Sequence, residues 1–158
     1  SSDALRGLLE AVRHLTRRQV VTVYGCGGDR DAAKRPLMGA VAANMSDKVV
    51  LTSDNPRSEQ PLDIIADIEL GLLDTKPPYV TIPDREEAIV RTIVEANPGD
   101  VVVVAGKGHQ RYHEIGTQLV PFEDGTVART ALSWQTTAAL LLPLGAPFQP
   151  AGLLRLPL

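Results

Sequence analysis

The chain has 158 residues, which is the size of one domain. Hydrophobic residues make up 44% of it and charged residues 22%, an ordinary globular composition that excludes wholesale disorder. The formal net charge of −3 argues against nucleic acid or an anionic membrane as the main partner, because both need a net basic face. The one cysteine excludes an intramolecular disulfide and fits a reducing, cytoplasmic environment.

In chain order, segments with helical spacing of apolar residues alternate with short apolar runs. The helical spacing predicts helices over residues 3–15, 36–45, 61–73, 84–96 and 127–134. The short runs predict strands over residues 20–24, 49–52, 79–82 and 101–105, the last buried on both faces. This order favours an α/β, Rossmann-like fold with a mostly parallel sheet flanked by helices. Residues 112–115 and 118–122 predict a late hairpin and an antiparallel edge strand.

The composition changes near the end of the chain. Residues 138–158 carry a single charge, Arg155, and four prolines. Those prolines would break a spanning helix, so we predict no membrane segment. We therefore expect one domain over residues 1–136 and a Pro/Leu-rich terminal extension of unknown role over residues 137–158. Because the sequence begins without Met and has no signal-peptide pattern, it is expected to be an excised domain.

Three unusual segments directly follow predicted strands: residues 25–35, 54–57 and 106–110. Ligands of open α/β sheets bind beyond the carboxyl ends of the strands, so these segments predict one shared site. The first fails the dinucleotide fingerprint because Arg30 stands where a third glycine is needed. Its glycines could merely supply positive φ in a tight turn, and its charges could form a solvated face.

The third segment resembles the end of a phosphate-binding loop but is not one, because Gly108 stands where Ser or Thr would hold magnesium. Lys107 and His109 could both be solvated loop residues. Cys26 is most simply a small apolar residue. No histidine spacing suggests metal ligation, so no metal site is predicted in this domain.

Residues 54–57 are the most informative segment. Pro56 fixes the backbone and biases Asn55 toward an extended shape. Arg57 offers a planar fork suited to two carboxylate oxygens, while Asp54 and Asn55 supply acceptors. Together they could hold a group that bears a carboxylate and an ammonium, the end of an amino acid. The alternative is an Asx-type turn with a surface arginine.

The three segments, in this order and at this spacing, resemble one family. The residues that carry the resemblance are Tyr24-Gly25-Cys26-Gly27-Gly28-Asp29-Arg30-Asp31 with Lys34-Arg35-Pro36-Leu37-Met38, Asp54-Asn55-Pro56-Arg57, and Gly106-Lys107-Gly108-His109. They resemble the C-terminal domain of the MurE ligases of the Mur ligase family, over residues 3–129. The resemblance implies part of a cytoplasmic, ATP-dependent amide ligase of peptidoglycan biosynthesis. The uridine-nucleotide domain and the central ATP domain of that family are absent from this chain.

The resemblance also implies a reaction. The γ-carboxyl of D-glutamate in UDP-MurNAc-L-Ala-D-Glu is activated as an acyl phosphate, with ATP and Mg²⁺ bound mainly by the central domain. The domain seen here packs against that domain and receives meso-diaminopimelate, whose amine attacks. The residues implied to contact meso-diaminopimelate are Arg30, Asp54, Asn55, Pro56, Arg57, Gly106 and Gln110. Candidate contacts on the ATP side are Asp29, Lys34 and Arg35. The chain contains no P-loop, so it is expected to be inactive alone.

The choice of amino acid follows from Arg57, because bound lysine would leave its guanidinium unpaired. Gln110 departs from the family, which usually has glutamate there, and residues 123–126 and the tail also depart. Two alternatives stay open. One is a non-catalytic module that binds an amino acid or a nucleotide. The other is the corresponding domain of a ligase of the folylpolyglutamate or cyanophycin synthetase type.

Overall fold

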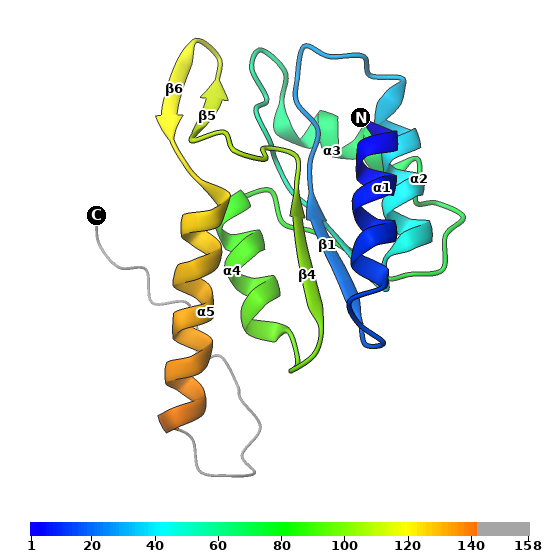
Figure 1. The fold of residues 1–158 in the computed structure, drawn as a ribbon. Coiled ribbons are helices and arrows are strands. Elements are labelled where there is room, and N and C mark those ends of the chain that lie inside the picture. Colours follow the sequence, from blue (N-terminus) through cyan, green and yellow to red (C-terminus); the bar gives the residue numbers. More distant parts are fainter. Residues whose placement is uncertain (142–158) are drawn as a thin grey trace.

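The computed structural model describes residues 1–141, with the side chains of residues 1–135. Helices and strands alternate along most of this length, as the sequence predicts (Figure 1). The elements are α1 (Ser2–Arg13), β1 (Val20–Tyr24), α2 (Lys34–Met45), β2 (Lys48–Leu51), α3 (Pro61–Glu69), β3 (Tyr79–Thr81), α4 (Arg85–Glu95), β4 (Val101–Ala105), β5 (Tyr112–Ile115), β6 (Gln118–Pro121) and α5 (Asp124–Leu141).

Four parallel strands form the main sheet in the order β3-β2-β1-β4. The chain starts at β1, builds outward through β2 and β3, and then returns to place β4 on the other side of β1. The strand order therefore reverses between β1 and β4. In open α/β sheets, the crevice beyond the carboxyl ends of the strands at such a switch point is where ligands bind. The predicted Rossmann-like fold class is confirmed.

Alternate residues of β1 enter two separate cores. Val20 and Tyr24 pack with buried residues of α1, α2 and α3 on one face of the sheet. Val21 and Val23 pack with buried residues of α4 and α5 on the other face. Figure 1 shows the resulting three layers, with α4 and α5 on the side of the sheet opposite α1. A strand covered on both faces needs apolar residues in nearly every position, which is why β1 reads as a continuous apolar run.

Strand β4 is less buried than its four valines predict. It lies at the edge of the sheet, and Val103 is its one residue below a tenth of full exposure. Residues 101–105 pack against a core on each face, as predicted, but all except Val103 are only partly buried. Helices cover both faces of the sheet here, but within residues 1–141 no neighbouring strand covers the outer edge of β4.

The predicted hairpin forms, but in the described residues it adds no antiparallel edge strand to the main sheet. β5 and β6 pair only with each other, as a separate two-stranded sheet. A single parallel bridge between Arg57 and Ile115 joins this hairpin to the loop that follows β2. The hairpin therefore lies against the candidate site rather than beside β4 (Figure 1).

Helix α5 begins before the predicted residue 127 and continues to Leu141. The predicted start of the terminal extension, residue 137, thus lies inside a helix. Residues 142–158 of the predicted extension lie outside the described residues. Within the described part, none of the helices combines the length and the apolar character needed to cross a membrane.

Candidate functional site

The three segments singled out in the sequence meet at the carboxyl edge of the sheet, around an open cavity of about 690 Å³. Six of the seven residues predicted to contact an amino acid line this cavity, and Pro56 does not. The six are Arg30, Asp54, Asn55, Arg57, Gly106 and Gln110. Apolar side chains of α1 and α2 line the opposite wall, among them Leu5 and Met38.

The first and second segments are held together by direct backbone contact. The Gly28 amide donates to the Asn55 carbonyl at 2.8 Å. A Cβ atom on Gly28 would lie 1.9 Å from the Pro56 carbonyl oxygen, so only glycine permits this approach. Gly28 does not have positive φ, and the residue of this loop that does is Asp29, with φ of 52°. The interpretation that these glycines merely supply positive φ is therefore wrong at Gly28.

Lys107 is a buried residue that connects two of the segments. It retains 3% of its exposure, so its interpretation as a solvated loop residue is wrong. Its ammonium donates to Asn55 Oδ1 and, at 2.8 Å, to the Tyr112 carbonyl. Asp54 Oδ1 lies 3.3 Å from the same nitrogen. Burial lowers the pKa of Lys107, and the Asp54 carboxylate opposes that shift.

Asn55 connects Lys107 to Gln110, a residue of the cavity wall. It is 2% exposed, and its Nδ2 donates to Gln110 Oε1 at 3.1 Å. Its Oδ1 accepts from Lys107 and from the Glu114 amide, the latter at 3.0 Å. Both ends of the Asn55 amide are thus satisfied by protein, and they set the position of Gln110.

Arg57 has a strained backbone that the hairpin stabilises. Its φ is 53°, in the left-handed region that non-glycine residues rarely occupy. The Arg57 amide donates to the Glu114 carbonyl at 3.1 Å, and its own carbonyl accepts from the Gly116 amide at 2.7 Å. The side chain is 20% exposed and lines the cavity, which does not agree with the alternative of a surface arginine.

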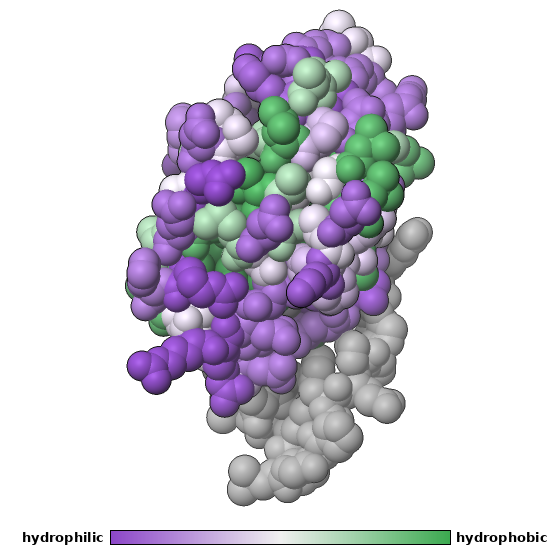
Figure 2. Space-filling model, turned by 90° about the vertical axis from the view of Figure 1, so that its right-hand side faces the viewer, coloured by the Kyte–Doolittle hydropathy of each residue, from purple (hydrophilic) through white to green (hydrophobic). Residues whose placement is uncertain are grey.

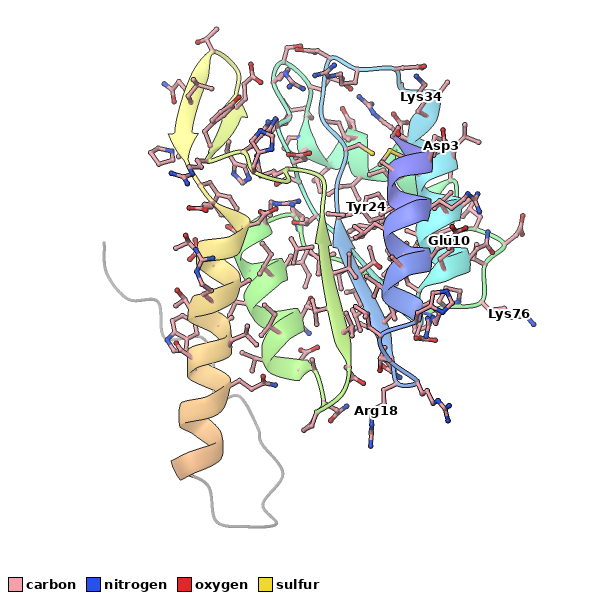
Figure 3. The ribbon with its side chains drawn as sticks, in the orientation of Figure 1. Asp3, Glu10, Arg18, Tyr24, Lys34 and Lys76 are labelled. Carbon is pink, nitrogen blue, oxygen red and sulfur yellow. The ribbon has the colours of Figure 1, made fainter. Side chains whose placement is uncertain are left out.

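The three candidate contacts on the ATP side have different surroundings. Arg35 is 3% exposed, and its guanidinium pairs with Glu59 at 2.7 Å and with Asp67 at 2.8 Å. Asp29 accepts from the Ser58 hydroxyl at 2.5 Å. The side chain of Lys34 is 65% exposed and lines the cavity (Figure 3).

The Glu59 carboxylate ties the Gly28 loop to helix α2. It accepts from Arg35 and, at 2.6 Å, from the Asp29 amide. These bonds, led by that from Arg35, lower the pKa of Glu59. The charge run at residues 29–35, for which a solvated face was one of the alternatives, therefore contains one buried arginine that fixes the loop.

The ion pair between Arg85 and Asp124, which lies beneath the site, was not predicted from the sequence. The Arg85 side chain is fully buried, and its Nε and Nη2 donate to the two carboxylate oxygens of Asp124 at 2.8 and 2.7 Å. It also donates to the carbonyls of Ala105 and Ser53 at 3.0 and 3.2 Å. Arg85 occupies the first position of α4, where the helix dipole disfavours a cation. That unfavourable position is the signal that could have identified it.

Cys26 is a small buried residue, as the sequence indicated. Its Sγ lies 3.8 Å from Met38 Sδ. Burial raises the pKa of the Cys26 thiol to about 11, so the group is neutral at physiological pH. The described residues hold no cluster of three or more His, Cys, Asp or Glu side chains placed to bind a metal ion.

The surface on the side of α1 and α2 contains both hydrophobic and hydrophilic residues. Figure 2 shows hydrophobic patches surrounded by hydrophilic residues on this face. Leu8 and Leu37 are two exposed apolar residues of these helices, at 43% and 59% exposure. Leu8 also lines the cavity.

Three comparisons with known proteins each found proteins similar to this chain. A family profile described as Mur ligase, glutamate ligase domain, matches residues 1–108. The UDP-N-acetylmuramoyl-L-alanyl-D-glutamate–2,6-diaminopimelate ligase of Solibacter usitatus is 53% identical over 132 residues, which are 84% of this chain and 27% of the relative. The ligase of the same name from Geobacillus kaustophilus is 52% identical over 82% of this chain and 27% of its own length.

A solved structure of a protein with the same ligase name superposes with a TM-score of 0.80 at 41% identity, covering 86% of this chain and 28% of that one. The chain thus spans about a quarter of the length of the relatives it matches.

Proposed function

This chain belongs to the Mur ligase family, and from that premise we propose that it supplies the amino-acid-receiving domain of a ligase that adds meso-diaminopimelate to UDP-MurNAc-L-Ala-D-Glu in peptidoglycan biosynthesis. The observation that carries the proposal is the cavity at the switch point of the sheet. There, arginine, aspartate and amide side chains from loops distant in sequence line the same space, among them Arg57, Asp54 and Gln110. The names of the relatives support the choice of substrates.

The far end of diaminopimelate carries a carboxylate and an ammonium. We assign the carboxylate to Arg57, whose guanidinium retains hydrogens that no described protein group accepts. We assign the ammonium to Asp54 and Gln110, which line the same cavity. Asp54 Oδ1 is buried 3.3 Å from the Lys107 ammonium, and the Asp54 side chain, which is 12% exposed, lines the cavity and supplies negative charge for such a donor. Arg30 and the Gly106 backbone complete the wall.

Discrimination against lysine follows from the same arrangement. Lysine has the ammonium but lacks the second carboxylate. When it is bound, the guanidinium hydrogens of Arg57 that Glu114 and the Gly28 carbonyl do not accept lose solvent and gain no acceptor, and buried donors without a partner are unfavourable. Sites built to pair a polar substrate group reject analogues that lack it by large factors.

We propose that ATP and Mg²⁺ bind mainly outside this chain, in the central domain of the whole ligase, against which this domain packs in the cytoplasm. ATP supplies the phosphoryl group that activates the acceptor carboxyl. Of the three ATP-side candidates, Lys34 fits contact with a phosphate best, because its side chain is exposed at the cavity and its 3.5 Å ion pair with Asp31 is itself solvent-exposed. Arg35 and Asp29 are engaged by protein groups and are better suited to fixing the loop.

A chimera tests the proposal. The 132 residues of this chain that match the Solibacter usitatus ligase replace the corresponding segment of that enzyme, and ATP-dependent amide formation is measured with diaminopimelate, lysine and glutamate. We expect product with diaminopimelate and a rate at least about a hundredfold lower with lysine. Arg57→Ala should reduce that preference to nearly one.

A folded chimera without activity, or one with the same rates for lysine and diaminopimelate, would contradict the proposal. A preference for glutamate would instead indicate the domain of a folate- or cyanophycin-type ligase. The unmodified Solibacter usitatus enzyme serves as the positive control.

A further inference from the structure

The guanidinium of Arg57 is held by protein groups on two of its three nitrogens. Nε lies 2.9 Å from Glu114 Oε2, in an ion pair whose side chains are 20% and 34% exposed. Nη1 donates to the Gly28 carbonyl at 2.7 Å. Arg57 lines the cavity, whereas Glu114 does not. Glu114 therefore contacts the arginine from outside the space that a ligand would occupy.

We propose that Glu114 is the positioning residue that determines how Arg57 presents its charge, and hence a determinant of specificity for the second carboxylate of the amino acid. This inference rests on the proposed function. With Nε occupied by Glu114, a ligand carboxylate meets the guanidinium at the edge formed by Nη1 and Nη2. Such an end-on, two-point contact requires the plane of the guanidinium to be fixed before binding.

The position of Glu114 is set by its backbone and not by its side chain. Its amide donates to Asn55 Oδ1 at 3.0 Å, and its carbonyl accepts from the Arg57 amide at 3.1 Å. The Gly116 amide donates to the Arg57 carbonyl at 2.7 Å on the same strand edge. Removing the carboxylate of Glu114 therefore leaves the attachment of the hairpin intact. Variants at this position report on the guanidinium and not on the fold.

Charge balance supports the same role. Glu114 neutralises Arg57 while the cavity holds no ligand, so the arginine does not need to turn toward another carboxylate. Without Glu114, one bond to the Gly28 carbonyl is the remaining described contact of the guanidinium. A long side chain with a single anchor populates several rotamers, and ligand binding must then restrict them.

The first test needs no ligand. In nitrogen-15 NMR spectra of the 158-residue chain, we expect a resolved, slowly exchanging Arg57 Nε–H signal in the wild type. Glu114→Ala should broaden or remove it, and Glu114→Gln, which keeps an acceptor oxygen, should restore most of it. Glu10→Ala, on an exposed part of α1, is the matched control and should leave the signal unchanged.

The second test is NMR titration of the same chain with diaminopimelate and with lysine. Glu114→Ala should weaken diaminopimelate binding about tenfold and change lysine binding less than about twofold. In the Arg57→Ala background, Glu114→Ala should have no further effect, because Glu114 acts through Arg57. Unfolding midpoints of all variants should stay close to that of the wild type.

The outcomes distinguish the positioning role of Glu114 from the proposed use of Arg57 in binding diaminopimelate. If Arg57→Ala removes the preference for diaminopimelate and Glu114→Ala does not, the positioning role of Glu114 is wrong while the proposed function stands. If Arg57→Ala leaves the preference unchanged, the proposed use of Arg57 is wrong. If the wild-type chain binds neither amino acid, the Nε–H signal alone decides, and its persistence in Glu114→Ala overturns the inference.

Discussion

The ammonium of Lys107 donates a hydrogen bond to the side-chain oxygen of Asn55, and this bond joins the loop after β4 to the loop after β2 across the end of β1. Strands β2 and β4 do not touch each other, because β1 lies between them. The carboxyl edge of the sheet is therefore held together by a buried side-chain hydrogen bond in addition to the backbone hydrogen bonds between the strands.

Replacing Lys107 by Met should strongly destabilise the domain. Methionine fills a similar volume but leaves Asn55 Oδ1 with one donor fewer and the Asp54 carboxylate without its cation. Breaking a buried pair in this way costs about 3–5 kcal/mol. Urea unfolding measures the change. Lys76→Met, at an exposed position, should alter the free energy of unfolding by less than about 0.5 kcal/mol, and equal effects of the two variants would contradict this role of Lys107.

Gly28→Ala should separate the two loops that form one wall of the cavity. The new methyl group would lie 1.9 Å from the Pro56 carbonyl oxygen, so the backbone must move. We expect a loss of about 1–3 kcal/mol in the free energy of unfolding and weaker diaminopimelate binding. Gly7→Ala is the matched control. It lies in α1 with no heavy atom within 4 Å of the new methyl group, and it should stabilise the domain by about 0.5–1 kcal/mol.

Gln110→Glu should tighten the binding of both amino acids by a similar factor. The carboxylate can still accept from Asn55 Nδ2, as the Gln110 oxygen now does at 3.1 Å, and it adds charge to the bond with the ligand ammonium. Since lysine and diaminopimelate share that ammonium, their ratio should stay constant while both affinities rise severalfold. Calorimetry distinguishes this result from unchanged or weaker binding, which would place the ammonium elsewhere.

His113→Phe should make the domain less sensitive to acid. The imidazole stacks on Phe122 at a centroid distance of 4.1 Å, and its Nε2 is buried without a hydrogen-bond partner. Burial, with smaller contributions from Lys107 and Arg85, lowers the pKa of His113 from 6.5 to about 4.

The unfolded chain therefore binds the proton more readily, and stability falls as the pH decreases from about 6.5 to about 4, by up to about 1.4 kcal/mol per pH unit. Phenylalanine keeps the stacking and cannot titrate. Urea unfolding at about pH 7 and pH 4.5 should show a smaller loss for the variant than for the wild type. Equal losses would show that His113 does not carry the acid sensitivity.

The sequence predicted the location of the site because that location depends on local patterns. Each unusual segment directly follows an apolar run, and parallel strands bring their carboxyl ends to one edge. Asp54, Asn55 and Arg57 could be predicted to lie at that edge because they closely follow an apolar run, and their contact with an amino acid stays a prediction.

The residues that hold the site in place could not be predicted, because their burial depends on partners far away in the sequence. Lys107 is buried by Asn55, at a separation of 52 residues, and Arg35 by Glu59, at a separation of 24. Glu114 pairs with Arg57 from a hairpin whose position relative to the main sheet no periodicity encodes. Single charged residues in loops give the same local signal whether they are solvated or buried.

During synthesis, Arg85 leaves the ribosome 39 residues before Asp124. If the domain folded before Asp124 had been synthesised, the Arg85 guanidinium would be buried with only backbone carbonyls as partners. An incompletely paired buried cation of this kind costs several kcal/mol. The carboxyl edge of the sheet therefore reaches its final form only once the hairpin and the first turn of α5 have been translated. A nascent chain stalled before that point would present an open, unfinished edge to chaperones and proteases.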